Sequence, residues 1–312
     1  MLDLRDSAGD KLGSSFVTTP GQELKQVTVV GCGLIGSSFA LALKKNQACD
    51  RILGWDTSAS ILNEALEMGV IDDVDHAFSA GNVSASDLIY LAMPILQIVR
   101  FMREGILQTK SGAIITDAGS TKGVICRAAA EHLPDNRHFI GGHPIAGSHL
   151  SGVRHASAEL FSGATYVLTT DNLAKGSKPF NRVHETVEAL GARVKLMSAF
   201  DHDRLLALVS HLPQLLSSAL ARTVAEQHDA AALIALAGPG YKDTTRLAGS
   251  SWSMWSDVLA TNSAEIATAL DLIIRKLISV RNELHRFRTP DDSELDALRK
   301  LFNTYDPNPT CR

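Results

Sequence analysis

The sequence predicts an α/β fold, a doubly wound parallel sheet, followed by an all-helical domain. Over roughly the first two thirds of the 312 residues, short β-branched runs that end in Gly, Asp or Pro alternate with helical stretches. This alternation is typical of a mostly parallel sheet with helices on both faces. Near Ser198 the strand pattern stops, and apolar residues then recur at helical spacing.

The predicted elements of the first part follow one another in a regular order. We expect strands at Val27–Val30, Arg51–Trp55, Leu88–Ala92, Ala113–Thr116, Phe139–Gly141, Thr165–Thr169 and Arg193–Met197. We expect helices between them at Ile35–Asn46, Ala59–Met68, Ile95–Leu107, Gly123–His132 and Pro179–Leu190. Because crossover helices join parallel strands, the pattern predicts one mostly parallel sheet.

The second part contains two apolar stripes, one starting at Leu205 and one running from Val258 to Leu284. Pro213 interrupts the first stripe and should kink its helix. The second stripe exceeds a typical helix of about 11–12 residues, and so long a helix needs a partner. The partner can be its own domain or a second subunit, and we expect a homodimer. The predicted division is a flexible leader (1–24), an α/β domain (25–198) and a helical domain (199–312).

Composition excludes several classes of protein. The net charge is −4 and aromatic residues make up 5% of the chain, which argues against a nucleic-acid partner. No apolar run approaches the roughly 18 residues of a membrane span, and the charged N-terminus does not resemble a secretory signal. The four cysteines are far apart, so neither a disulfide framework nor a metal site is expected. These features indicate a cytoplasmic protein.

The first predicted strand leads into the sequence GCGLIG at residues 31–36, before a predicted helix. A GxGxxG pattern in this context is typical of a Rossmann-type dinucleotide site, in which the pyrophosphate lies at the helix N-terminus. The second strand ends in Asp56, whose carboxylate would bind a ribose 2′-hydroxyl and repel a 2′-phosphate, so NAD is expected rather than NADP. The residues expected at the cofactor are Gly31, Gly33, Leu34, Ile35, Gly36 and Asp56.

Three later segments are more specific: DAGSTKG at residues 117–123, GGHPIAGS at 141–148 and GYKDTTRLA at 240–248. Together with SHLPQ at 210–214 and the dipeptide MW at 254–255, they make the sequence resemble the prephenate dehydrogenase family, which includes arogenate and cyclohexadienyl dehydrogenases. The resemblance implies a Rossmann domain with a helical dimerisation domain. It also implies a hydride transfer to NAD(P)⁺ with loss of CO₂, in tyrosine biosynthesis.

The resemblance implies catalytic roles for two residues. His143 matches the histidine that takes the proton of the ring hydroxyl at C4, and a neutral imidazole suits that task. Ser120 matches the serine that hydrogen-bonds this histidine and the hydroxyl, although it could instead cap the following helix.

Four further residues match substrate-binding positions of the family: Arg246, His211, His149 and Trp255. Arg246 matches the arginine that binds a substrate carboxylate, for which a guanidinium is well suited. His149 stands where many members carry an acidic residue. A carboxylate there would pair with the ammonium of arogenate, so histidine favours prephenate.

The sequence therefore predicts NAD-dependent oxidative decarboxylation of prephenate to 4-hydroxyphenylpyruvate, CO₂ and NADH. One alternative is an arogenate or dual-specificity cyclohexadienyl dehydrogenase. Others are a different dehydrogenase of Rossmann-plus-helical architecture, or a catalytically silent NAD-binding protein.

Overall fold

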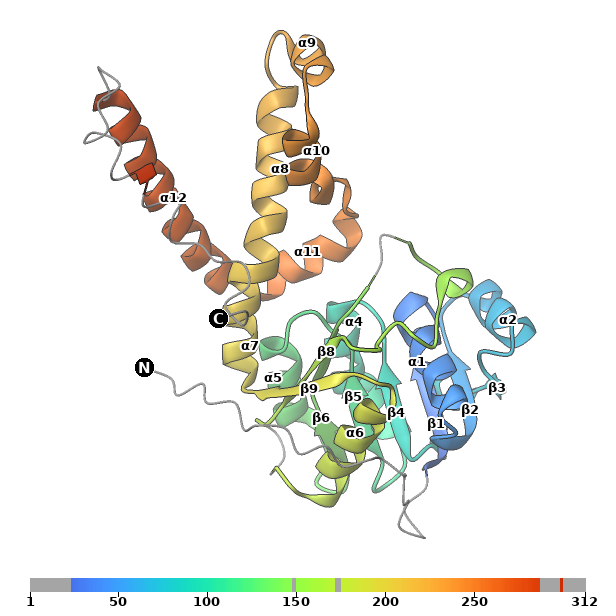
Figure 1. Ribbon diagram of the computed structural model, residues 1–312. Helices are drawn as coiled ribbons and strands as arrows, with labels where there is room; N and C mark the ends of the chain where they lie inside the picture. The colour runs from blue at the N-terminus through green and yellow to red at the C-terminus, as the bar shows by residue number, and fades with distance from the viewer. Residues whose placement is uncertain (1–23, 148–149, 172–174, 287–297, 300–312) are drawn as a thin grey trace, which may run out of the picture.

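The computed structural model describes residues 24–147, 150–171, 175–286 and 298–299. A six-stranded parallel sheet forms the centre of the first domain, in the order β3-β2-β1-β4-β5-β6 (Figure 1). Its strands are β1 (Leu24–Val30), β2 (Cys49–Trp55), β3 (Asp73–Val74), β4 (Leu88–Leu91), β5 (Ile114–Asp117) and β6 (His138–Ile140). The strand order reverses between β1 and β4, which is the point where open α/β sheets bind their ligands.

Helices cover both faces of this sheet (Figure 1). They are α1 (Leu34–Lys45), α2 (Ala59–Glu67), α3 (Ala77–Ala80), α4 (Ile95–Arg100), α5 (Gly123–His132) and α6 (Lys178–Ala189). A π-helical turn (Phe101–Gly105) and a 3-10 turn (Ile106–Gln108) extend α4, and a further 3-10 turn spans Val153–His155. The doubly wound fold predicted from the sequence is confirmed.

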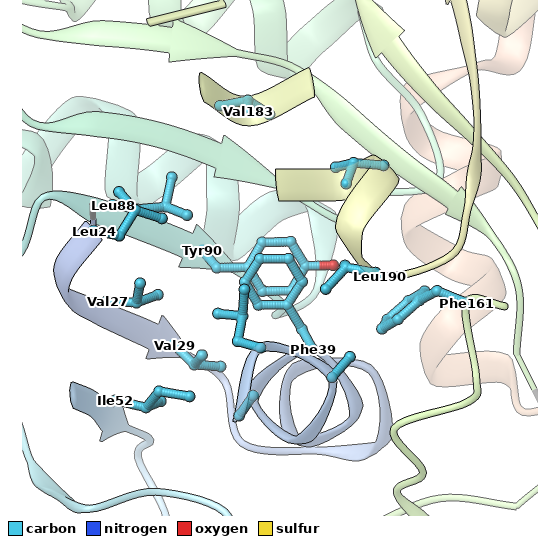
Figure 2. Close-up of a cluster of buried hydrophobic side chains, with 14 of the residues drawn as sticks. Leu24, Val27, Val29, Phe39, Ile52, Leu88, Tyr90, Phe161, Val183 and Leu190 are labelled. Carbon is cyan, nitrogen blue, oxygen red and sulfur yellow. The ribbon is translucent and has the colours of Figure 1, made fainter. Parts of the chain in front are cut away.

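Successive side chains of the central strands point into two different buried cores. Leu88 and Tyr90 of β4 face the core beneath α1, α2 and α6, and the Tyr90 ring stacks on Phe39 of α1 at 3.7 Å (Figure 2). Ile89 and Leu91 face the opposite core, under α4 and α5. This period of two is the geometry of a strand, and because both faces of the sheet are covered, β4 is buried throughout.

The second core continues into the helical domain. Ile98 of α4 and Ile125 of α5 belong to the same buried cluster as three residues of later helices, namely Leu212, Val258 and Ile266. Because one continuous apolar core spans both parts, the helices of the second domain pack directly on this face of the sheet domain.

The prediction of one sheet is wrong for its last strands. Three strands form a separate sheet in the order β7-β8-β9, namely β7 (Gly142–Ile145), β8 (Thr165–Thr169) and β9 (Arg193–Met197). Strand β7 runs antiparallel to β8, with His143 opposite Val167. It was missed because its sequence, GHPI, contains a glycine and a proline, which disfavour strands in general. Pro144 is tolerated because β7 is an edge strand.

The helical domain begins directly after β9. Ser198 caps α7 (Ala199–Leu206), and α7 continues through the π-helical turn η4 (Ala207–His211) into α8 (Leu212–Ala225). The irregular turn ends at His211, two residues before Pro213, which lacks the N–H that a regular helix needs. The remaining elements are α9 (Ala230–Ala235), α10 (Pro239–Thr245), the 3-10 turn η5 (Arg246–Gly249), α11 (Trp252–Thr261) and α12 (Ser263–Arg286).

The long second stripe is two helices rather than one. Asn262, with φ −128° and ψ 26°, leaves the helical conformation between α11 and α12. Its side chain instead donates to the carbonyl of Asp203, 2.8 Å away. A polar residue that bonds to another helix therefore breaks the run that the apolar spacing indicated.

Strand β1 begins at Leu24, and the rest of the expected leader lies outside the described residues. Among the helices that the structure describes, none has the length and hydropathy needed to cross a membrane.

Candidate active site

The glycine loop after β1 has the geometry of a dinucleotide site. Gly31 has φ +93°, and a Cβ there would lie 2.5 Å from the carbonyl oxygen of Ala92, so the turn requires glycine. Gly33 precedes α1, and a Cβ on it would meet nothing within 4 Å. A Cβ on Gly36 would lie 2.0 Å from the carbonyl oxygen of Gly31, so α1 packs against the loop only with glycine here. The loop thus leaves no room for a side chain at Gly31 or Gly36, whereas the space beside Gly33 is open.

Asp56, at the end of β2, lies beside this loop. One carboxylate oxygen accepts from the backbone N–H of Cys32 at 2.9 Å, and the other accepts from that of Ser58 at 2.9 Å. The carboxylate is therefore fixed next to the opening above Gly33. Each oxygen retains a lone pair for another donor such as a ribose hydroxyl.

A cavity of about 290 Å³ lies at the carboxyl ends of β4 and β5. Its lining comes from the two loops after these strands and from α11: Ala92, Met93, Pro94, Ile95, Ala118, Gly119, Ser120, Ser253, Met254 and Asp257. Asp257 also accepts from the backbone N–H of Leu96 at 3.1 Å, which links α11 to the start of α4. Ser120 thus lines a cavity shared by both domains.

A buried ion pair holds the backbone next to His143. Lys122 and Asp117 pair with side chains that are 0% exposed. Asp117 also accepts from the N–H of Gly142 at 2.9 Å, and the Lys122 ammonium donates to the carbonyl of Gly142 at 2.6 Å. Both polar groups of Gly142 are thus bonded to charged side chains, so the backbone that carries His143 is held firmly.

The side chain of His143 meets a histidine of the helical domain. Its Nδ1 lies 2.8 Å from Nε2 of His202, and Nδ1 of His202 lies 2.7 Å from Oδ1 of Asp203. The carboxylate of Asp203 in turn accepts from the backbone N–H groups of Lys122 (2.7 Å) and Gly123 (2.8 Å). A chain of hydrogen bonds therefore runs from His143 across the domain boundary and back to the DAGSTKG loop.

The imidazoles of this site are held neutral. Burial is the main cause that lowers the pKa of His143 well below 6.5, and the nearby His202 and Lys122 add to it. Burial likewise lowers the pKa of His202, and the hydrogen bond that His202 donates to Asp203 acts in the opposite direction. His211, also buried, has its pKa lowered to about 4, with burial again the largest cause. A neutral imidazole can accept a proton, which a general base requires.

His211 ends the π-helical turn and contacts residues of α11 and its C-terminal cap. The side-chain amide of Asn262 lies 3.2 Å from its Nδ1, and the ring of Trp255 packs edge-on at 5.9 Å. Since Asn262 also bonds to the carbonyl of Asp203, it joins His211 to the hydrogen-bond chain of His143. The structure therefore brings His211, Trp255 and His143 into one region.

Arg246 lies farther along the helical domain. It begins η5, which is held against α8 because the amide of Gln214 donates to the carbonyl of Leu247 at 2.8 Å. The Arg246 side chain is exposed. Within the described part of the chain, no hydrogen bond joins it to Ser120, His143 or His211. His149 lies outside the described residues.

The sequence predicts no individual role for six residues that build this region: Asp117, Lys122, His202, Asp203, Gln214 and Asn262. Asp117, Lys122 and Gln214 nevertheless lie within the motifs DAGSTKG and SHLPQ. For His202 a signal existed in the sequence. It lies three residues after Ala199 and four before Leu206, both buried, and so occupies the apolar face of α7. A histidine on a buried face needs a partner, and Asp203 follows it directly.

The fold and the site together define a dinucleotide-dependent dehydrogenase with a partly buried, neutral histidine between its two domains. Comparison with known proteins gives the particular family. Residues 39–196 match the family model "Prephenate dehydrogenase, nucleotide-binding domain" and residues 198–304 match "Prephenate dehydrogenase, dimerization domain". The chain belongs to the prephenate dehydrogenase family of NAD-dependent oxidoreductases.

Individual relatives agree with this assignment. The chain is 35% identical to prephenate dehydrogenase of Bacillus subtilis over 89% of its own length and 73% of that protein. Among solved structures, it is similar to prephenate dehydrogenase from A. aeolicus in complex with hydroxyphenyl propionate and NAD⁺ (TM-score 0.82, 27% identity, 90% and 97% coverage). It is also similar to Synechocystis arogenate dehydrogenase (TM-score 0.75, 28% identity, 89% and 97% coverage).

Proposed function

We propose that this protein catalyses the NAD-dependent oxidative decarboxylation of prephenate to 4-hydroxyphenylpyruvate and CO₂. The observation that carries the proposal is His143, a neutral imidazole fixed at the boundary of the two domains. The A. aeolicus relative binds hydroxyphenyl propionate, a phenol with a three-carbon acid chain. This compound resembles the proposed product, and supports a pocket for a ring with an acidic side chain.

The residues of the glycine loop fit NAD. The space above Gly33 admits a pyrophosphate close to the backbone, and the N-terminus of α1 favours its negative charge. The Asp56 carboxylate would accept a hydrogen bond from the ribose 2′-hydroxyl and repel a 2′-phosphate, which favours NAD over NADP. Leu34 and Ile35 begin α1 at the same loop. When bound, NAD⁺ supplies the hydride acceptor, and the protein supplies position and proton chemistry.

The reaction needs one base next to the ring hydroxyl. As the C–H bond at C4 gives up its hydride, His143 accepts the O–H proton and a ring ketone forms. The carboxylate para to that carbon then leaves as CO₂, and its bonding electrons make the ring an aromatic phenolate, which takes the proton back from His143 to give the phenol. The ammonium of Lys122 disfavours a positive charge on His143 before the reaction, which keeps the base free.

The other residues are proposed to bind the substrate. Ser120, in the cavity wall, would hydrogen-bond the ring hydroxyl together with His143. Arg246 would bind a carboxylate of the substrate through its guanidinium. His211 and Trp255 would line the pocket on the side of the helical domain, and His149 would lie near the substrate side chain.

Arogenate is the second candidate substrate, because the Synechocystis structure that resembles this chain is an arogenate dehydrogenase. Arogenate carries an ammonium where prephenate carries a keto group. His149 in place of a carboxylate favours prephenate.

The test is the appearance of NADH absorbance when the purified protein receives NAD⁺ with prephenate, arogenate or a 3-hydroxy acid. We expect turnover of prephenate, and a loss of about 10²–10⁴-fold in kcat for His143→Asn with NAD binding retained. Turnover of the 3-hydroxy acid alone would overturn the proposal. Near-normal kcat in His143→Asn would remove His143 from the mechanism.

The biological unit is proposed to be a cytoplasmic homodimer. The match of residues 198–304 to the family's dimerization domain supports this, as do the exposed apolar side chains of α12, among them Leu272, Leu277 and Leu284. A domain boundary at Ser198, between β9 and α7, is part of the same proposal. Sedimentation of the purified protein tests the assembly.

A further inference from the structure

We propose that His202 and Asp203 are positioning residues that hold His143 in the tautomer with its proton on Nδ1. The Nε2 atom of His143 then keeps a free lone pair for the proton of the substrate hydroxyl. The inference rests on the proposed function, in which His143 is the base. It assigns to the helical domain a part in the proton chemistry as well as in substrate binding.

The chain of hydrogen bonds has a fixed acceptor at one end. Both oxygens of Asp203 accept from backbone N–H groups, Oδ1 from Lys122 and Oδ2 from Gly123. Burial alone would raise the pKa of Asp203, but these bonds and the one from His202 lower it. Asp203 is therefore a carboxylate without a proton to donate. The 2.7 Å contact with Nδ1 of His202 must be bridged by a proton on that nitrogen.

The proton on Nδ1 of His202 determines the protonation of Nε2 of His202 and then that of Nδ1 of His143. A neutral imidazole carries one N–H, so His202 with its proton on Nδ1 has a bare Nε2. That atom lies 2.8 Å from Nδ1 of His143, a distance at which one of the two nitrogens must donate. The donor is therefore Nδ1 of His143. Since His143 is also neutral, its Nε2 is bare and can accept a proton.

The competing arrangement has a doubly protonated His202 that donates to both neighbours. It would place the proton of His143 on Nε2 and turn the base into a donor. Burial and the charge of Lys122 disfavour it, because both lower the pKa of His202. Asp117 and Asp203 act in the opposite direction, but the net pKa of His202 is lowered. Around His143 itself, the neighbouring His202, Lys122 and His211 all disfavour added positive charge.

The first test reads the tautomer directly. We would record the nitrogen shifts of ¹⁵N-histidine in the full-length protein with NAD⁺ bound, at neutral pH and without substrate, and assign His143 by comparison with His143→Asn. We expect its proton on Nδ1. A proton on Nε2 overturns the inference, and the measurement needs no variant of His202 to fold.

The second test uses two amides of different reach. The side-chain oxygen of His202→Gln can stand near the position of Nε2 and still accept from His143. The shorter His202→Asn reaches only toward Asp203. We expect His202→Asn to lower kcat by about 10²–10⁴-fold, the range of general base catalysis, and His202→Gln to recover at least about tenfold of that loss. The KM for NAD⁺ should stay unchanged in both.

The pH profile separates this role from a merely structural one. Since His202 helps to lower the pKa of His143, its replacement should move the acid limb of kcat/KM to higher pH. Equal losses in the two variants with an unmoved acid limb would overturn the inference. The NMR experiment also keeps the two proposals apart. If prephenate and arogenate both fail to react while His143 carries its proton on Nδ1, the proposed function fails and the positioning role stands.

Discussion

Replacement of the buried Lys122 by methionine should destabilise the protein strongly. The Lys122 and Asp117 side chains are both 0% exposed, so neither charge is screened by water. Methionine fills most of the same volume but leaves the carboxylate without its cation and the carbonyl of Gly142 without a donor. Removal of one partner of a buried pair costs about 3–5 kcal/mol. The two remaining backbone donors to Asp117, from Gly119 and Gly142, favour the lower half of that range.

The assay is thermal and urea unfolding of Lys122→Met beside a matched surface variant. A loss of about 3–5 kcal/mol corresponds to a fall in Tm of about 6–20 °C for a domain of this size. The control is Lys45→Met, whose ion pair with Glu159 has side chains 56% and 61% exposed. An exposed pair contributes at most about 1 kcal/mol, so the control should unfold almost like the parent.

A double variant tests the electrostatic reason. Asp117→Asn combined with Lys122→Met removes both charges, so it should be more stable than Lys122→Met alone. If Lys122→Met loses no more stability than Lys45→Met, the reasoning from burial is refuted. A double variant as unstable as the sum of the single changes would refute the role of the unpaired charge.

Three other changes have distinct expected outcomes. Gly36→Ala should lower the free energy of unfolding by about 3 kcal/mol, because its Cβ would lie 2.0 Å from the carbonyl oxygen of Gly31. Gly33→Ala, whose Cβ would meet open space, should keep its stability and bind NAD⁺ more weakly. Urea unfolding measures the first effect, and titration with the cofactor measures the second. Arg246→Ala should raise the KM for prephenate by about 10–100-fold and change kcat little. Steady-state kinetics measure both constants, and an unchanged KM would contradict the proposal that Arg246 binds a substrate carboxylate. The free energy of unfolding should be highest above pH 6.5 and fall as the pH drops toward about 4, because the pKa of His211 is lower in the folded than in the unfolded protein. This group alone accounts for about 3 kcal/mol of that fall. Urea unfolding across this pH range measures the dependence, which should be weaker in His211→Gln.

Local sequence pattern was sufficient for the Rossmann core. The short apolar runs of β1 and β4 are typical of strands in a sheet covered on both faces, and successive residues of each strand meet different helices. Gly31 and Gly36 could be recognised because their positions exclude a Cβ for reasons that any such loop shares. These features depend on residues close together in the chain or on one strand-to-helix turn. A single sequence is therefore sufficient to predict them.

Features that depend on contacts distant in the sequence could not be read in this way. Strand β7 exists because its backbone pairs with β8 and because Asp117 and Lys122 bond to Gly142, although its own residues disfavour a strand. The break at Asn262 is set by a bond to Asp203, 59 residues away. In both places a polar contact from another element overrides local propensity.

The loop of residues 117–123 explains how the two domains act as one site. Asp117 and Lys122 hold the backbone of Gly142, next to His143, and Ser120 lines the cavity between the domains. The next contacts reach the helical domain, since the hydroxyl of Thr121 lies 2.8 Å from that of Thr261 and the backbone N–H of Lys122 bonds to Asp203. A shift of the helical domain would therefore disturb both His202, the hydrogen-bond partner of His143, and the loop of residues 117–123. The hydrogen bonds thus couple the orientation of His143, the proposed base, to the packing of the two domains. On the proposed mechanism, substrate contacts on the helical side can therefore influence the proton acceptor on the other side.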